Sequence, residues 1–323
     1  MRFDIKPRLW SMYILIIIAA VIWSVFESKP DLGEVSRLSQ NKQYAEALQL
    51  LDPILEEYPD DLDALNQKGY LLLRMGRNEE ALLALTRVVE EDPNHDAALN
   101  NLSWAYHNLH LYRLANTYID RALLISQNSD VQYVNKGNIE LALKNYDNAL
   151  KYYDLALRLN AESENAAYGK GLMYYRQANY QEAIVWLTKH LELVPDDQDG
   201  WNYLVSAYVK ATDYAGAAGV YQKRIEQEPA NHQLLVSLGG IYVKMQEYDK
   251  ALALFDEVIR QSPDFARAYY EKALLMSVRG EYDAAFDNVA LAIGHDEDYR
   301  YVLKDEPQFD RLRQMPRYKQ LFM

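Results

Sequence analysis

Cysteine is absent from this chain of 323 residues. Its absence excludes a disulfide framework, a catalytic thiol, a cysteine-ligated zinc site and a bacterial lipid-modified cysteine. A chain without cysteine is compatible with any redox compartment, so this count does not indicate where the protein resides.

Catalytic signatures are also missing. The sequence contains no HExxH, GxSxG, P-loop or GxGxxG motif and only six histidines. His107 and His110 are three apart on one expected helix, which would place them on one face. Without a nearby carboxylate or cysteine they form a weak metal signal, and we interpret them as two polar helix residues. We therefore expect no enzyme activity, catalytic residue, metal, cofactor or small-molecule substrate.

Positive charge is scarce relative to negative charge. The chain has 34 Lys and Arg against 47 Asp and Glu, for a net charge of −13. This balance argues against a general nucleic-acid binder, so we expect no nucleic acid among the partners. Charged residues at 25% and apolar residues at 50% indicate a globular chain.

Residues 9–26 form an uncharged apolar run of 18 residues. At about 1.5 Å per residue a helix of this length spans roughly 27 Å, close to the ~30 Å hydrocarbon core of a bilayer. Trp10 and Trp23 lie near its ends, where interfacial anchors are found. We predict an uncleaved transmembrane helix over 9–26, after a short basic tail at 1–8. The alternative is a cleaved signal peptide, which has a shorter apolar core and small residues at its cleavage site.

The charges on either side of this run predict its orientation. Arg2, Lys6 and Arg8 precede it, whereas basic and acidic residues are mixed after it. The positive-inside rule then leaves the N-terminus in the cytoplasm. We expect a single-pass protein of the bacterial inner membrane with the rest of the chain in the periplasm. A chain that faces the cytoplasm is the alternative.

An alanine recurs every 34 residues through eight copies of one pattern, without insertion. These alanines are Ala47, Ala81, Ala115, Ala149, Ala183, Ala217, Ala251 and Ala285. Seven of the eight copies have a tyrosine three residues earlier, and five have a proline twelve residues later. A fixed period over eight copies indicates one structural unit used repeatedly.

Each copy predicts two antiparallel helices. Its second half is apolar at i, i+3, i+4 and i+7, and the proline that often follows cannot continue a helix. Its first half carries a second apolar stripe, and a short polar break separates the two. Small residues are expected where the helices cross closely. On the first helices these are Gly69, Ser103, Gly137, Gly171, Gly239 and Ala273.

The copies at 201–229 and 234–263 resemble the tetratricopeptide repeat (TPR) family. In the second stretch the motif positions are occupied by Leu235, Leu238, Gly239, Tyr242, Ala251, Phe255 and Pro263. The resemblance implies an all-α, right-handed superhelical solenoid of about eight 34-residue helix-turn-helix units over 28–299. The first unit departs from the motif at Glu34 and Val35 and has Pro53 inside its second helix. We interpret it as an atypical end repeat.

Residues 300–323 contain apolar side chains among many charges. The stretch 305–321 is similar to the end-of-group segment seen after some TPR arrays. We expect it to cap the last helix, which has one apolar face and no further neighbour. A partner-binding tail is the alternative.

In TPR arrays the concave groove is lined mainly by the first helix of each unit. By resemblance, the candidate partner-binding residues in this chain are Arg74, Asn100, Asn101, Trp104, His107, Asn108, Asn135, Asn138, Tyr175, Arg176, Lys210 and Lys244. The lining positions hold six basic and three acidic residues, so this face is positive although the chain is negative. Asparagine amides can hold the backbone of an extended peptide, and basic residues favour an acidic segment. Ordinary solvated polar residues are the alternative.

Some TPR domains bind the acidic tails of chaperones through a Lys/Asn clamp. The position that needs lysine holds Leu32, Asn66, Asn100, Val134, Tyr168, Asn202, Val236 and Tyr270 in this chain. No unit has the lysine, which argues against a chaperone co-receptor.

The function expected from these patterns is that of a membrane-tethered scaffold or assembly factor for an envelope complex. Its partners would be proteins or extended peptide segments, bound in the groove and concentrated at the membrane by the anchor. Two alternatives stay open: a periplasmic holdase-type chaperone, and a non-catalytic subunit that positions an envelope enzyme.

Overall fold

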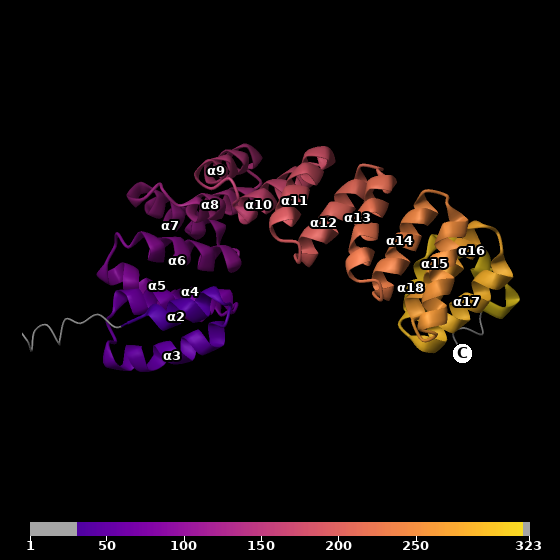
Figure 1. The fold of residues 1–323 in the computed structure, drawn as a ribbon, viewed down its shortest axis with the longest axis horizontal. Helices are drawn as coiled ribbons and strands as arrows, with labels where there is room; N and C mark the ends of the chain where they lie inside the picture. The colour runs from indigo at the N-terminus through magenta and orange to yellow at the C-terminus, as the bar shows by residue number, and fades with distance from the viewer. Residues whose placement is uncertain (1–30, 319–323) are drawn as a thin grey trace, which may run out of the picture. The chain divides into compact units, whose positions relative to one another are not determined.

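The computed structural model describes residues 31–318, the side chains of 303–305 excepted. Within that range the regular structure is entirely helical (Figure 1). No helix between residues 31 and 318 is both long and apolar enough to cross a bilayer. The transmembrane helix expected at 9–26, with Trp10 and Trp23, lies outside the described residues and stays a prediction.

Helix pairs follow one another at intervals of 34 residues. The first helices are α2 (Gly33–Gln40), α4 (Leu62–Arg74), α6 (Asp96–Asn108), α8 (Asp130–Ala142), α10 (Glu164–Arg176), α12 (Gln198–Lys210), α14 (His232–Lys244) and α16 (Ala266–Val278). The second helices are α3 (Tyr44–Glu57), α5 (Asn78–Glu91), α7 (Tyr112–Ile125), α9 (Tyr146–Leu159), α11 (Tyr180–Leu193), α13 (Tyr214–Gln227), α15 (Tyr248–Gln261) and α17 (Tyr282–His295). The predicted period is confirmed, and the short α2 agrees with an atypical first unit.

Most first helices begin at a polar cap in the same register. The Asp61 carboxylate accepts the Ala64 N–H at 2.8 Å, and the His95 Nδ1 accepts the Ala98 N–H at 3.2 Å. Ser129, Asp197 and Asn231 cap α8, α12 and α14 in the same way. Each cap satisfies a backbone donor that the first helical turn leaves without a partner.

The turn between the two helices of a pair contains a residue in the left-handed conformation. Between residues 31 and 318, the eight residues with positive φ are Lys42, Gly76, His110, Lys144, Ala178, Thr212, Gln246 and Gly280. Glycine occupies this position only twice, although it alone adopts the conformation without steric cost. The close packing of each pair therefore imposes the turn on whatever residue stands there.

The helices of a pair cross closely through small residues, as predicted. Each of the eight periodic alanines on the second helices is completely buried. On the first helices, a Cβ at Gly69 would lie 2.4 Å from Leu85 Cγ, and one at Gly239 would lie 2.4 Å from Phe255 Cε1. Only glycine therefore fits these two positions without movement of the facing side chain.

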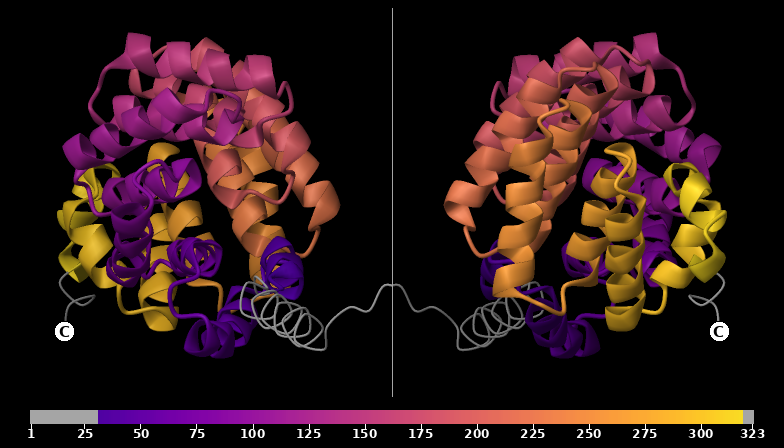
Figure 2. Two further views of the ribbon diagram at one scale, coloured as in Figure 1. Left: turned by 90° about the vertical axis from the view of Figure 1, so that its left-hand side faces the viewer. Right: turned by 90° about the vertical axis from the view of Figure 1, so that its right-hand side faces the viewer.

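The described chain divides into two units, at 31–166 and 167–318, with the division inside α10. Within each unit the pairs stack side by side (Figure 2). Completely buried side chains of the first unit are Val35, Leu51, Leu71, Leu85, Val88, Leu99 and Ile119. Those of the second are Leu187, Val236, Phe255, Val258, Leu275, Val289, Phe309 and Leu312. Each unit is thus built around its own apolar interior.

After α17 come α18 (Tyr299–Asp305), the 3-10 helix η1 (Pro307–Phe309) and α19 (Asp310–Arg313). Phe309 and Leu312 are completely buried and belong to the same core as α16 and α17. The Ser277 hydroxyl donates to the Gln308 carbonyl at 2.5 Å, and the Arg317 guanidinium lies 4.1 Å from the centre of the Phe286 ring. These contacts cover apolar surface that the last helix pair would otherwise expose.

Candidate protein-interaction surface

A small pocket lies between two successive first helices of the first unit. It has a volume of about 110 Å³. Its lining residues are Ser103, Trp104, His107 and Asn108 from α6 with Asn135, Asn138 and Ile139 from α8. Five of these seven residues were predicted as groove residues from the sequence. The repeat register therefore brings side chains about 30 residues apart in the sequence to one hollow.

Four asparagines form a hydrogen-bonded ladder across α4, α6 and α8. The Asn135 amide donates to Asn100 Oδ1 at 2.8 Å, and the Asn101 amide donates to Asn66 Oδ1 at 2.9 Å. A longer bond of 3.5 Å joins Asn100 Nδ2 to Asn101 Oδ1. Asn100 and Asn101 are buried, with 9% and 8% of their surface exposed. Their amides therefore link neighbouring first helices, and the half-buried Asn66 and Asn135 are the more accessible members.

Two further amides of the pocket are fixed by bonds to second helices. Asn138 Oδ1 accepts the Tyr153 hydroxyl at 2.7 Å, and Asn108 Nδ2 donates to Asn78 Oδ1 at 2.9 Å. Each amide forms one hydrogen bond, which fixes the orientation of the side chain. The other end of the amide group is therefore held in a fixed direction as well. The pocket is therefore a preorganised polar surface.

Arg74 lies among aromatic rings of α3, α4 and α6. Its guanidinium carbon is 5.1 Å from the centre of the Tyr44 ring and 6.0 Å from that of Trp104. Tyr70 also packs against Trp104, at 6.1 Å between ring centres. Cation–π contacts hold the charge in place while leaving it accessible. Arg74 itself is exposed.

In the second unit, Tyr175 belongs to an aromatic cluster. Its ring centre is 5.4 Å from that of Tyr203 and 5.7 Å from that of Tyr180, and its hydroxyl lies 2.7 Å from Ser206 Oγ. Tyr168 also packs against Tyr203, with 6.3 Å between the ring centres. Burial, with the nearby charge of Asp197, raises the pKa of Tyr168 to about 12. Tyr168 therefore keeps its proton at neutral pH, and the rings of the cluster offer aromatic contact surface on α10 and α12.

Three basic residues of the second unit stand at the last positions of successive first helices. They are Arg176 on α10, Lys210 on α12 and Lys244 on α14, and all three are exposed. None forms an ion pair with a residue in the described range. A cation at a helix C-terminus is stabilised by the helix dipole. This effect accounts in part for the recurrence of a basic residue at the last position of these helices. An accessible row of positive charge nevertheless remains for a partner.

Family models described as tetratricopeptide repeat match residues 38–102 and 208–275, and residues 134–198. Together they cover more than half of the chain. The chain belongs to the tetratricopeptide repeat family. No curated protein sequence matches it.

Solved structures share the TPR fold at low sequence identity. PilW, a type IV pilus biogenesis factor, has a TM-score of 0.55 at 15% identity, over 63% of this chain and 94% of that one. Pseudomonas aeruginosa PilF has a TM-score of 0.50 at 21% identity, over 66% and 96% of the two chains. The Cut9–Hcn1 structure of the APC/C has a TM-score of 0.52 at 17% identity, over 87% and 54%. These matches show the fold alone.

One sequence expectation about the TPR units is wrong. His107 and His110 do not share a helix, because α6 ends at Asn108 and His110 occupies the left-handed turn with φ of 60°. Its Nδ1 lies 2.8 Å from the Tyr112 hydroxyl. Across the described part of the chain, no group of three or more His, Asp or Glu residues is placed to hold a metal ion.

The sequence patterns do not identify Ser103 as a site residue. It was assigned only as a small residue at the helix crossing, a register that holds Gly69, Gly137, Gly171 and Gly239 in other TPR units. In the structure it is completely buried and lines the pocket, and its Oγ has no hydrogen-bond partner among the described residues. The available signal was that it is the one hydroxyl among the residues at this register.

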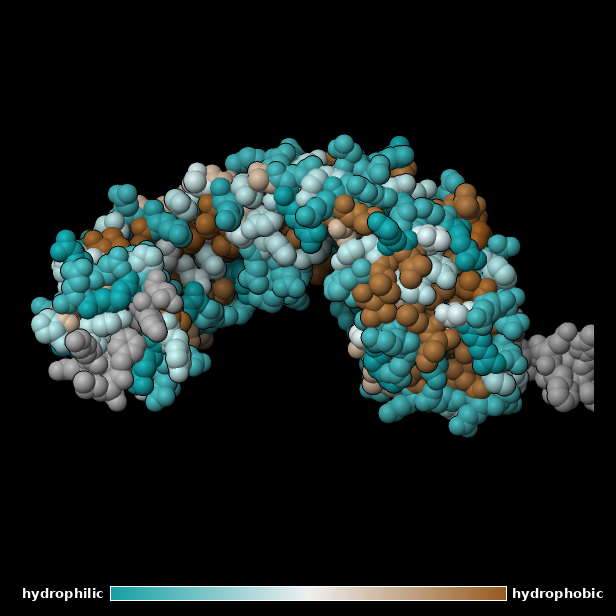
Figure 3. Space-filling model, turned by 180° about the vertical axis from the view of Figure 1, so that it is seen from behind, coloured by the Kyte–Doolittle hydropathy of each residue, from teal (hydrophilic) through white to brown (hydrophobic). Residues whose placement is uncertain are grey.

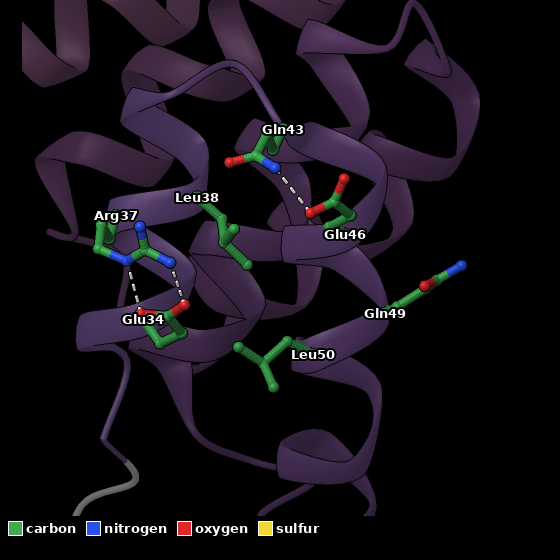
Figure 4. A pocket seen from close by; sticks show the side chains of 7 residues that line it. All are labelled: Glu34, Arg37, Leu38, Gln43, Glu46, Gln49 and Leu50. Atoms are coloured by element: carbon green, nitrogen blue, oxygen red, sulfur yellow. Dashed lines mark hydrogen bonds and ion pairs between the residues drawn. The ribbon is translucent and has the colours of Figure 1, made fainter.

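The outer end of the first TPR unit carries a wider hollow, of about 560 Å³, between α2 and α3 (Figure 4). Its polar side chains bind one another. Arg37 forms an ion pair with Glu34 at 2.5 Å, and the Gln43 amide donates to the Glu46 carboxylate at 2.8 Å. Seen from behind, the half of the chain at 31–166 also carries a broad apolar area on its surface, on the right of Figure 3. Because the polar groups of the hollow in Figure 4 already bind one another, they leave few groups for a ligand. The polar pocket between α6 and α8 is the better candidate site.

Proposed function

We propose that this protein is a membrane-tethered scaffold or assembly factor that binds partner proteins along the first helices of its repeats. A TPR array is typically a non-catalytic scaffold for protein interactions, and this chain belongs to that family. The partner is an extended segment of another protein. The solenoid stands in the periplasm, with the predicted helix at 9–26 in the inner membrane.

The observation that carries this proposal is the convergence of predicted groove residues on one pocket between α6 and α8. Side chains with directed amides suit a peptide backbone, which presents donors and acceptors at every residue. Trp104 and Tyr175 add apolar contact area at a low cost in side-chain entropy. The exposed row of Arg176, Lys210 and Lys244 favours an acidic stretch or a free carboxylate.

The role in envelope assembly is supported by the shared fold of PilW, a type IV pilus biogenesis factor. An anchor next to the first repeat raises the effective concentration of the bound segment at the membrane. The tethered array would therefore recruit a partner of modest affinity to the membrane surface.

Affinity capture of the full-length protein from membranes in mild detergent tests the groove. The variant Arg176→Ala/Lys210→Ala/Lys244→Ala removes the basic row from the second unit. The matched control, Lys189→Ala/Lys223→Ala/Arg260→Ala, removes the same charge from the second helices of the same repeats. We expect the wild type and the control to retain a stoichiometric partner and the row variant to lose most of it. Equal retention by all three would place the interface elsewhere.

Membrane tethering needs a separate measurement. Carbonate extraction of membranes should leave the full-length protein in the pellet and release a chain that lacks residues 1–27. Protease added to intact spheroplasts should digest the repeats if they face the periplasm. Repeats that survive until the inner membrane is opened would contradict the proposed orientation.

A further inference from the structure

Ser103 on α6 carries a buried hydroxyl group. Its Oγ is buried and has no hydrogen-bond partner among the described residues, and the residue belongs to the lining of the α6–α8 pocket. A buried polar group without a partner destabilises a protein by its desolvation cost. A ligand atom that enters this pocket can remove that cost.

The other polar groups of the pocket offer both donors and acceptors. Asn138 uses its oxygen for the Tyr153 hydroxyl, so its NH₂ is directed away from that bond. Asn135 and Asn108 each use an amide N–H for another asparagine, which leaves their oxygens as acceptors. No other described group bonds to these three free ends. A matching ligand therefore needs a donor and an acceptor close together.

The absence of acidic and strongly basic residues from the pocket limits which chemical groups it can bind. No Asp, Glu, Lys or Arg belongs to its lining. A carboxylate taken into such a site would lose its hydration without meeting a permanently charged cation, and an ammonium would meet no carboxylate; the one ionisable lining residue is His107. A purely apolar side chain would leave Ser103 and the amides without partners.

We infer that this pocket receives the side-chain carboxamide of a glutamine or asparagine in the bound partner segment. The inference rests on the proposed function, since it assigns one contact of the same groove. A primary carboxamide carries two N–H donors and a carbonyl acceptor on adjacent atoms. It can accept from Asn138 and Ser103 while it donates to Asn135 and Asn108.

The size of the pocket agrees with this occupant. About 110 Å³ corresponds to three or four water molecules at ~30 Å³ each. The terminal amide of one side chain and its adjacent methylene are smaller than this volume and fit within it. The flat wall formed by Trp104 and the apolar side chain of Ile139 then contact the methylene.

Nuclear magnetic resonance of the full-length protein in detergent tests this inference with three small probes. Propionamide reproduces the glutamine side chain, propionate its charged isostere, and 2-butanone an isostere without N–H donors. The reporter is the Trp104 indole N–H, assigned with Trp104→Phe, at pH 8. We expect propionamide to shift this signal saturably, with a dissociation constant on the order of 10 mM. The other two probes should bind at least about fivefold more weakly.

Ser103→Ala is the decisive variant because it removes a hydroxyl that bonds to nothing in the unoccupied pocket. Its melting temperature should be equal to or higher than that of the wild type. Its affinity for propionamide should fall by about threefold to tenfold. Ser237→Ala, on α14 in the second unit, is the control and should leave binding unchanged.

The outcomes separate this inference from the proposed function. Equal binding of all three probes, no saturation by propionamide, or an unchanged affinity in Ser103→Ala would overturn the carboxamide pocket. If a partner is nevertheless captured from membranes, the scaffold function stands without it. Saturable, Ser103-dependent binding of propionamide without any captured partner would support the pocket and count against the scaffold.

Discussion

Gly137 on α8 lies directly against the ring of Tyr153 on α9, so that a Cβ at Gly137 would lie 2.6 Å from Tyr153 Cε1. Tyr153 is completely buried and its hydroxyl is held by Asn138, so the ring cannot move aside. We expect Gly137→Ala to lower the free energy of unfolding by about 1–3 kcal/mol, partly offset by alanine's higher helix propensity of about 1 kcal/mol. Urea denaturation followed by circular dichroism measures the change.

The matched control for that substitution is Gly240→Ala on α14. A Cβ at Gly240 meets nothing within 4 Å. Only helix propensity changes, and the variant should be more stable by up to about 1 kcal/mol. A loss of stability in Gly240→Ala as large as that of Gly137→Ala would contradict the packing described for the crossing.

The left-handed turn predicts opposite effects at two equivalent positions. Gly76 has φ of 75° and an open surrounding, so Gly76→Ala should destabilise by about 1 kcal/mol through backbone strain alone. Ala178 occupies the same turn with φ of 57°, and Ala178→Gly should stabilise by about 0.5–1 kcal/mol. Thermal melts of both variants test the pair, and changes of the same sign would disprove the shared conformation.

Glu271 on α16 predicts a pH dependence. Burial raises the pKa of its carboxyl group, and the repulsion of Glu306 acts in the same direction, against the attraction of Arg267 and Lys244. A folded-state pKa above the unfolded value of about 4.3 means that this group's stabilisation is fully present below that value. It is lost as the pH rises through the raised pKa.

Glu271→Gln should therefore gain stability relative to the wild type between pH 4 and pH 7. Calorimetric melting temperatures at both pH values give the difference. Glu226→Gln, an exposed residue on α13, is the control for the loss of one negative charge. If the wild type and Glu271→Gln keep the same separation at both pH values, burial of the carboxylate has no energetic consequence.

Phe309 predicts how strongly the C-terminal segment contributes to the second unit. Its ring is completely buried and packs on Tyr270, with 6.1 Å between ring centres. Phe309→Ala should destabilise this unit by about 3–5 kcal/mol and expose the C-terminal segment to proteolysis. Gln314→Ala, at an exposed position nearby, should leave both the melting temperature and the cleavage pattern unchanged.

The helix pairs could be predicted from the sequence because their determinants are periodic. The alanines at the crossings and the breaks between helices recur at one spacing, so each copy supports the interpretation of the others. The ladder from Asn66 to Asn135 could not be predicted, because it depends on how far one pair is displaced along the next. A bond between residues 35 positions apart follows from that displacement and not from the period itself.

The turn at His110 shows a second limit of the sequence. Six of the eight left-handed positions are occupied by residues that give no local signal for this conformation, among them Lys144 and Thr212. Packing of the two helices determines the turn, and the residue adopts it at a cost. The pocket beside Ser103 could not be predicted for a similar reason, since three of its lining residues come from α8 of the next repeat.

The asparagine ladder also bears on how the first unit unfolds. In a repeat array each pair touches only its neighbours, so cooperativity depends on the strength of each interface relative to the pairs themselves. The bonds from Asn66 to Asn101 and from Asn100 to Asn135 strengthen two consecutive interfaces. The second, third and fourth pairs should therefore melt as one block, while fraying begins outside it, at α2 and α3. Amide exchange along the chain would then show a plateau of protection from α4 to α9 in place of a gradual slope.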